Sequence, residues 1–279
     1  MMNSFPSRIT RVALLLACAG TAFAQGMPTS QPTLLTIVRE DVKIGRGDEH
    51  ARFEAGWPAA YAKAKSPDYY LAYVSMTGPS ESWYVTPFAS HTAIADGMKR
   101  DAADPVLSAE LKRLSRGDAE FLNNVRVMQA VGRPDLSSGA FPDLAKVRFT
   151  EITWFRVRPG HEASWEAAAK AYRAAAQRAA PSTSYRIYQI MAGVPGPTYL
   201  VFSTLESYAA FDQMMASGQA TMAGATADEM AALQKFSAEG LINSETQRFR
   251  IDPVQSYVSP QARAVDPAFW TPKKEPARP

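Results

Sequence analysis

Cysteine is almost absent from this sequence. Its 279 residues include one, Cys18, and that residue falls in a predicted export signal that the mature protein would lose. After such a cleavage, disulfides, thiolate nucleophiles, iron–sulfur clusters and cysteine-ligated zinc are all excluded. An exported protein without disulfides depends on its core, and 46% hydrophobic residues suffice for one or two domains.

The only long apolar run lies at the N-terminus. Arg8 and Arg11 precede the apolar residues 12–19, and Ala22-Phe-Ala24 forms a small-x-small cleavage site. This pattern predicts a signal peptide over residues 1–24 and a periplasmic or secreted protein. The alternative is a lipoprotein signal with Cys18 acylated. No segment reaches the ~20 apolar residues of a transmembrane helix, so none is expected.

The sequence also lacks a large net charge and the common nucleotide-binding motifs. Loss of residues 1–24 would remove two arginines and no acidic residue, so the formal charge of +3 falls to +1. The remaining chain has no lysine or arginine cluster, which argues against a nucleic-acid partner. No Gly-x-Gly-x-x-Gly motif, Walker loop or Gly-x-Ser-x-Gly elbow occurs. Familiar nucleotide-dependent enzymes and serine hydrolases are therefore not expected.

What the chain does contain is an internal similarity. Residues 34–131 and 147–251 align as two divergent copies of one unit, with residues 42–49 matching residues 155–162 at a strand–turn–helix start. A repeat of this length indicates a duplicated domain. The remaining segments are a lead-in (25–33), a linker (132–146) and a proline-rich tail (252–279), which we expect to be extended with Phe269-Trp270 as an anchor.

Each copy has the hydrophobic periodicity of a β-α-β-β-α-β unit with an extra helix before its last strand. In the first copy we expect strands at 34–44, 69–76, 82–88 and 125–131, and helices at 49–64, 90–98 and 105–123. In the second copy we expect strands at 147–157, 185–191, 197–203 and 244–251, and helices at 162–179, 206–216 and 225–239. This is the split βαβ pattern of ferredoxin-like units and predicts an α+β fold.

The first hairpin indicates how the two copies meet. Apolar or aromatic residues occupy both faces of residues 69–76, as in strands that are covered on both sides. Helices can cover one face, and the sheet of the other copy is the economical cover for the second. We therefore expect an intramolecular barrel, a pseudo-dimer within one chain.

Two segments of the second copy support a family resemblance. They are Arg158-Pro-Gly-His-Glu-x-x-Trp-Glu166 and Phe202-Ser-Thr-Leu-Glu-Ser-Tyr208. With the strand order, they make the chain resemble the dimeric α+β barrel superfamily, tandem duplicated, which includes monooxygenases of the antibiotic-biosynthesis type. The resemblance implies the fold and a cleft. It leaves the activity open, because this superfamily holds haem-degrading, quinol-oxidising and isomerising members.

The three histidines of the sequence are poorly placed to bind a metal ion together. No two are spaced to bind one metal ion, so no metal site is predicted. His50 and His161 fall near the starts of the first helices, where we expect them to be exposed. His91 follows the strand at 82–88 and is the candidate acid–base residue or haem ligand. No histidine falls on the core face of a predicted helix, so we expect no cofactor, with haem as the weaker alternative.

Other candidates lie on strands. Glu40, Asp41 and Glu151 could act as general bases if buried, and otherwise they point to water. Strand aromatics line many ligand pockets but also fill cores. A charged residue within a strand lies at an edge or is positioned for an anion. The cleft candidates are Tyr73, Trp83, Trp154, Arg186 and Tyr188.

Three functions remain open from the sequence. The first is an exported protein with an aromatic cleft for a small apolar or phenolic ligand. The second is a monooxygenase- or isomerase-type enzyme that needs no cofactor and uses His91 or a strand carboxylate as base. The third is a non-catalytic scaffold that presents the duplicated barrel to partners.

Overall fold

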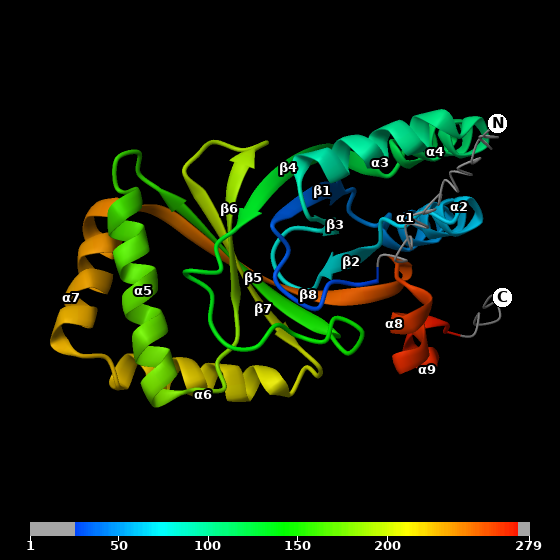
Figure 1. The fold of residues 1–279 in the computed structure, drawn as a ribbon. Coiled ribbons are helices and arrows are strands. Elements are labelled where there is room, and N and C mark those ends of the chain that lie inside the picture. The colour runs from blue at the N-terminus through cyan, green and yellow to red at the C-terminus, as the bar shows by residue number, and fades with distance from the viewer. Residues whose placement is uncertain (1–25, 273–279) are drawn as a thin grey trace, which may run out of the picture.

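The protein forms a closed barrel of eight antiparallel strands with helices packed outside it (Figure 1). This computed structural model describes residues 26–272. The predicted export signal, residues 1–24, lies outside the described residues. Among residues 26–272, no helix combines the length and the apolar character that crossing a membrane requires.

The two halves of the chain run through similar elements. The first half contains β1 (Leu34–Val42), α1 (Gly47–Glu54), α2 (Gly56–Ala64), β2 (Tyr70–Ser75), β3 (Glu81–Phe88), α3 (His91–Ala103), α4 (Pro105–Asp118) and β4 (Leu122–Gly132). The second contains β5 (Phe149–Val157), α5 (Glu162–Ala179), β6 (Arg186–Ala192), β7 (Thr198–Leu205), α6 (Ala210–Ala223), α7 (Ala227–Lys235), the π-helical turn η1 (Phe236–Gly240) and β8 (Leu241–Tyr257). Two short helices, α8 (Pro260–Val265) and α9 (Pro267–Trp270), follow.

The strand order explains how the barrel closes. Neighbouring strands follow β4-β1-β3-β2 in the first half and β8-β5-β7-β6 in the second. Two seams join the halves: β2 pairs with β8, where Tyr73 faces Ile251, and β4 pairs with β6, where Gly132 faces Tyr188. Every strand edge is therefore paired, which removes the exposed edges of an open sheet.

The barrel interior is a packed aromatic core. Its side chains alternate along the strands with those that face the helices, as the period of two in a strand requires. Trp83 and Trp154 meet edge to face with ring centroids 5.3 Å apart, and Tyr73 meets Phe202 at 6.3 Å. The fully buried members of this core are Ile37, Trp83, Met128, Ala130, Ile152, Leu200 and Phe249.

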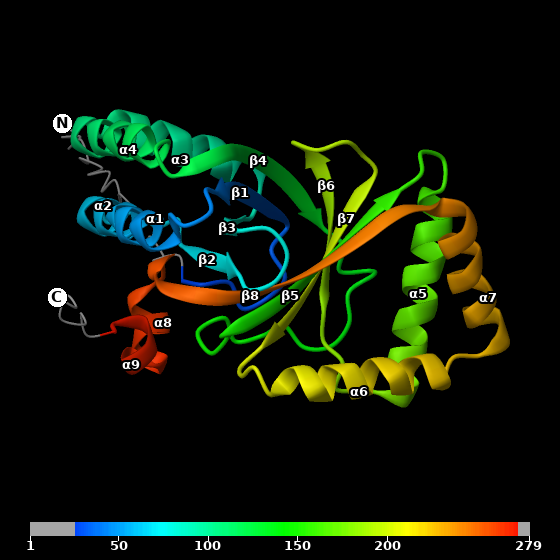
Figure 2. The same ribbon diagram turned by 180° about the vertical axis from the view of Figure 1, so that it is seen from behind.

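Two helical layers cover opposite ends of the barrel (Figure 2). The first-half helices pack closely, since a Cβ on Gly117 of α4 would overlap the ring of Phe53 in α1. The helix expected over residues 49–64 is divided at Ala55 into α1 and α2. In the second half, α6 runs across the base of α5 rather than beside it (Figure 1).

The C-terminal segment differs from the extended tail that its prolines predicted. β8 continues to Tyr257, and α8 and α9 follow. Pro260 and Pro267 are in the first turns of these helices, directly after the N-cap residues Ser259 and Asp266. Proline is favourable there, because a backbone N–H at this position would make no hydrogen bond within the helix. Trp270 is buried, and its indole nitrogen donates to the carbonyl oxygen of Ala145 at 2.9 Å.

Candidate functional site

A cavity of ligand size lies in the second half, outside the barrel. It has a volume of about 590 Å³ and lies between the outer face of the β5–β7–β6 sheet and helices α5, α6 and α7. Glu151, Thr153 and Phe155 of β5 line it, whereas Ile152 and Trp154 between them belong to the barrel core. Its apolar walls include Phe155, Trp165, Tyr172, Met214, Leu233 and Phe236.

Three hydrogen-bond donors in these walls have no partner among the described residues. They are the hydroxyls of Tyr185 and Thr183 and the indole nitrogen of Trp165, and Tyr185 and Trp165 are each 5% exposed. Burial raises the pKa of Tyr185, so this hydroxyl keeps its proton. Buried donors are normally paired, so these atoms are unsatisfied groups within the walls, below the surface of the cavity.

An ion pair lies at the edge of the same cavity. Arg248 of β8 donates from Nε to Oε2 of Glu151 at 3.0 Å, and both residues line the cavity. The guanidinium of Arg248 also lies 4.1 Å from the ring centroid of Phe211, a cation–π distance. Glu151, one of the predicted strand carboxylates, is therefore held beside this largely apolar cavity.

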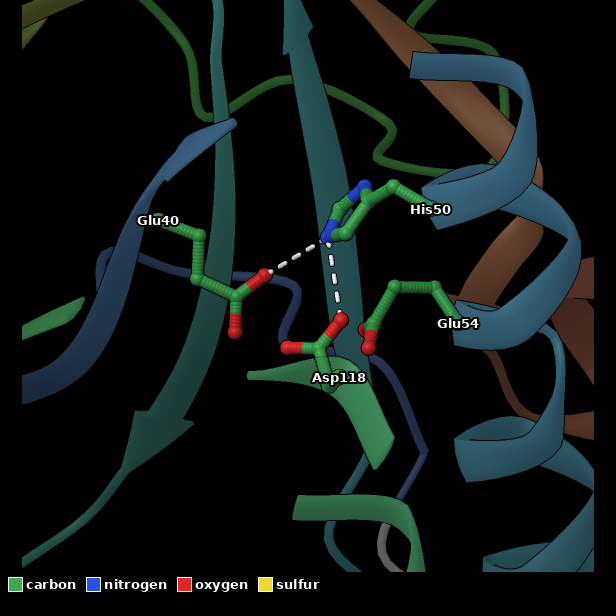
Figure 3. A group of neighbouring side chains, drawn as sticks. All are labelled: Glu40, His50, Glu54 and Asp118. Carbon is green, nitrogen blue, oxygen red and sulfur yellow. Dashed lines mark hydrogen bonds and ion pairs between the residues drawn. The ribbon is translucent and has the colours of Figure 1, made fainter. Parts of the chain in front are cut away.

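A second concentration of polar groups lies in the first half (Figure 3). Glu40 comes from β1, His50 and Glu54 from α1, and Asp118 from the end of α4. Nε2 of His50 is 3.0 Å from Oε2 of Glu40 and 3.5 Å from Oδ1 of Asp118. One donor atom from each residue lies within 4.8 Å of those of the other three. We call these four residues the buried tetrad.

Burial dominates the electrostatics of the tetrad. It raises the pKa of Glu40 and of Glu54 to about 9, and the neighbouring carboxylates add to both shifts. It raises the pKa of Asp118 and lowers that of His50. In each case the loss of water disfavours the charged form. Burial therefore disfavours separate charges on the four side chains.

The sequence prediction for His50 was wrong. We expected an exposed histidine at a helix start, but His50 is 2% exposed and faces the tetrad. Glu40 is also buried, so it does not point to water. One signal could have found this arrangement: His50 and Glu54 are four residues apart, which places them on the same face of a helix.

The predicted cleft residues are divided between two places in the barrel. Tyr73, Arg186 and Tyr188 line a small cavity of about 60 Å³, and Trp154 borders another of about 190 Å³. Trp83 is fully buried, and its indole nitrogen donates to Oε2 of Glu81 at 2.9 Å. None of the five lines the second-half cavity.

Arg186 and His91 have simpler surroundings than the sequence suggested. The guanidinium of Arg186 donates to the carbonyl oxygens of Ser138, Tyr185 and Gly139 at 2.5, 2.7 and 2.9 Å. It thereby fixes the segment between the two halves. His91 is the first residue of α3 and is exposed. Its catalytic role stays a prediction.

Comparison with known proteins identifies the fold. No protein-family model and no curated protein matches the chain. Among solved structures, a candidate monooxygenase of Fusobacterium nucleatum is 8% identical, with 80% of this chain and 94% of that chain covered and a TM-score of 0.54. An anthrone oxidase-like protein is 12% identical, with 80% and 92% covered and a TM-score of 0.54. A chlorite dismutase of Candidatus Nitrospira defluvii is 7% identical, with 81% and 93% covered and a TM-score of 0.48.

These likenesses show the fold alone. The chain has the dimeric α+β barrel fold, as the resemblance noted in its sequence implied. A shared fold at such low identity does not carry an activity.

Proposed function

We propose that the protein binds a small apolar or phenolic molecule in the cavity of the second half. The observation that carries this proposal is the cavity itself, with about 590 Å³ enclosed by aromatic and aliphatic walls. Small-molecule sites commonly occupy roughly 300–1,000 Å³ and combine apolar walls with a few polar groups. The ion pair of Glu151 and Arg248 supplies charged groups at the edge.

The polar residues of the lining narrow the chemistry of the ligand. A carbonyl or phenolic oxygen accepts hydrogen bonds, and Ser203, Gln213 and Ser217, which line the cavity, carry side-chain donors. The aromatic walls favour a flat ring system, because rings pack against rings edge to face or with offset stacking. A ring compound with one oxygen acceptor fits these features better than a fully saturated lipid.

A mutation in α6 tests this binding without disturbing the walls. Gly218 lines the cavity, and a Cβ there would meet no atom within 4 Å. We expect Gly218→Phe to project into the cavity and to weaken binding of N-phenyl-1-naphthylamine, an apolar ring probe, by tenfold or more, about 1.4 kcal/mol. Gly218→Ala is the matched control and should bind as the unchanged protein does. Equal affinity in both variants, measured by fluorescence titration, would place the ligand elsewhere.

Oxidation of the bound ligand is the second candidate function. The fold neighbours include a candidate monooxygenase and an anthrone oxidase-like protein, and Glu151 provides a carboxylate in the cavity. In this proposal Glu151 takes a proton from an activated ring methylene, and the resulting anion reduces dioxygen. The balance is CH2 + O2 → C=O + H2O, which requires no bound cofactor.

Oxygen uptake with anthrone as the probe separates the two functions. Glu151→Gln should abolish uptake while leaving the affinity for the ring probe within about twofold, because the amide keeps the shape of the side chain but accepts no proton. If the unchanged protein binds anthrone and consumes no oxygen, oxidation is rejected and binding stands.

We further propose that the halves are duplicated ferredoxin-like units in an exported protein. The equal strand order of the halves supports the duplication, and the charged and apolar residues at the N-terminus support the export. Cell fractionation with N-terminal sequencing tests the second part. We expect the mature protein in the periplasm or medium, beginning at Gln25, and a cytoplasmic protein with an intact N-terminus would refute it.

A further inference from the structure

The buried tetrad combines one imidazole with three carboxylates in a place that water does not reach. All four residues are at most 6% exposed. From their geometry and charge we propose that Glu40, His50, Glu54 and Asp118 bind one divalent transition-metal ion, of the class Mn²⁺, Fe²⁺ or Zn²⁺. Helices α1 and α4, which carry three of the four residues, lie at the end of the barrel opposite α5 and α7 (Figure 1), and this inference does not depend on the proposed function.

The spacing of the donor atoms suits an ion. Ligands at about 2.1 Å from a metal are separated from each other by roughly 3 to 4.2 Å. In the tetrad, His50 Nε2 lies 3.0 Å from Glu40 Oε2 and 3.5 Å from Asp118 Oδ1, and one donor atom from each residue lies within 4.8 Å of the others. The donor atoms of the tetrad are therefore almost as close together as the ligands of a bound metal ion. Small rotations of the carboxylate side chains would bring them to coordination distance.

The charge of the tetrad has no other compensation in the part of the chain that the structure describes. No lysine or arginine lies within ion-pair distance of Glu40, Glu54 or Asp118, and His50 is the single basic partner. Buried carboxylates are normally paired or coordinate a metal. Three of them in contact repel one another unless protons or a cation intervene, and a divalent cation removes two negative charges at once.

An unpaired oxygen points to the same conclusion independently. Glu54 is 3% exposed, its Oε1 has no hydrogen-bond partner among the described residues, and its carboxylate is directed towards Asp118 and His50 (Figure 3). Oδ1 of Asp118 also lacks a hydrogen bond. Orphaned buried acceptors are uncommon in folded proteins. A metal ion between the four side chains would satisfy both oxygens.

The donor types select the class of ion. Calcium and magnesium prefer shells made of oxygen alone, whereas the imidazole of His50 favours a transition metal or zinc. The absence of sulfur ligands disfavours Cu⁺. Because the ligands come from β1, α1 and α4, the bound ion would fasten two helices to the barrel, as structural metal ions do.

Metal analysis of the intact purified protein tests the inference. We expect about one equivalent of bound metal after growth with Mn²⁺, Fe²⁺ or Zn²⁺, its removal by a chelator with a lowered melting temperature, and recovery of both when the metal returns. X-ray absorption should show one imidazole nitrogen among oxygen ligands. Less than about 0.1 equivalent together with no metal-dependent change in melting temperature overturns the proposal.

Variants locate the ion. Glu54→Gln keeps the shape of a protonated glutamate and should remain folded, but it should lose the bound metal and the metal-dependent shift. His50→Gln should do the same. The matched control is Asp48→Asn, an exposed carboxylate on the same helix, which should retain a full equivalent. Retention of metal in both tetrad variants would show that the ion binds elsewhere and would overturn the assignment.

Discussion

The two halves of this molecule share a strand order, but they differ in what lies between the sheet and the helices that cover it. In the first half the buried tetrad lies between the sheet and the helices, and a cavity of about 480 Å³ lies among helices α2, α3 and α4. In the second half the corresponding space is a cavity of about 590 Å³. The barrel thus fixes the frame, while the helical layer decides whether a half encloses a polar cluster or a ligand-sized space.

One pair of strand positions shows the difference directly. Glu40 and Phe155 are each the seventh residue of a nine-residue strand, β1 and β5, and both strands shift register at their last residue. Glu40 joins the tetrad, whereas Phe155 forms an apolar wall of the cavity. The same position in the fold therefore carries opposite chemistry in the two halves.

Replacing a leucine by alanine in each helical layer should give the largest difference in the free energy of unfolding between the two halves. Leu114 of α4 is 1% exposed in the packed layer, and Leu233 of α7 is partly buried beside the cavity. We expect Leu114→Ala to lower the free energy of unfolding by about 2–5 kcal/mol. Leu233→Ala should cost about 1 kcal/mol, because its side chain already faces empty space. Urea denaturation measures both, and equal losses would mean that the second layer is as tightly packed as the first.

Added methyl groups should give a smaller contrast. A Cβ at Gly117 of α4 would overlap the ring of Phe53, whereas a Cβ at Gly218 of α6 would meet nothing within 4 Å. Gly117→Ala should lower the free energy of unfolding by about 1–3 kcal/mol through overpacking. Gly218→Ala should raise it by up to about 1 kcal/mol, since alanine favours the helix. A change in the free energy of unfolding in the same direction for both substitutions would contradict the proposed difference in packing between the two halves.

Removal of one hydroxyl gives the smallest expected contrast. Tyr84 donates to Oε1 of the buried Gln255 at 2.8 Å, whereas the hydroxyl of Tyr185 has no partner among the described residues. Tyr84→Phe should cost about 1–2 kcal/mol by leaving that acceptor unpaired. Tyr185→Phe should leave stability unchanged or raise it, because no hydrogen bond is lost. A loss of stability in Tyr185→Phe would reveal a partner for that hydroxyl.

Several elements could be predicted from the sequence because their signals are local. The helix expected over residues 162–179 has the bounds of α5, and the strands expected at 82–88 and 147–157 end where β3 and β5 end. Proline was the misleading signal, since Pro260 and Pro267 begin short helices instead of extending the tail. The aligned repeat placed Val42 opposite Phe155, two positions away from the pairing that the strands show.

The candidate sites were harder to predict, because each is built from residues distant in the chain. His50 and Glu54 share one helix, but Glu40 and Asp118 join them only when β1 and α4 pack against α1. Tyr73, Trp83 and Tyr188 were rightly identified as strand aromatics, yet they fill the barrel core. The second-half cavity lies on the outer face of the sheet, opposite the barrel core. Residue type alone does not indicate which face of a strand borders a cavity.

The alternation of strands and helices and the apolar faces that close the barrel follow from the periodicity of the amino-acid sequence and from the need to bury apolar surface. The presence of a ligand-sized cavity in one half and of the buried tetrad in the other depends on contacts between elements that are distant in the chain. Helix spacing depends on contacts such as that between Gly117 and Phe53, which form between elements and leave no periodic signal in the chain.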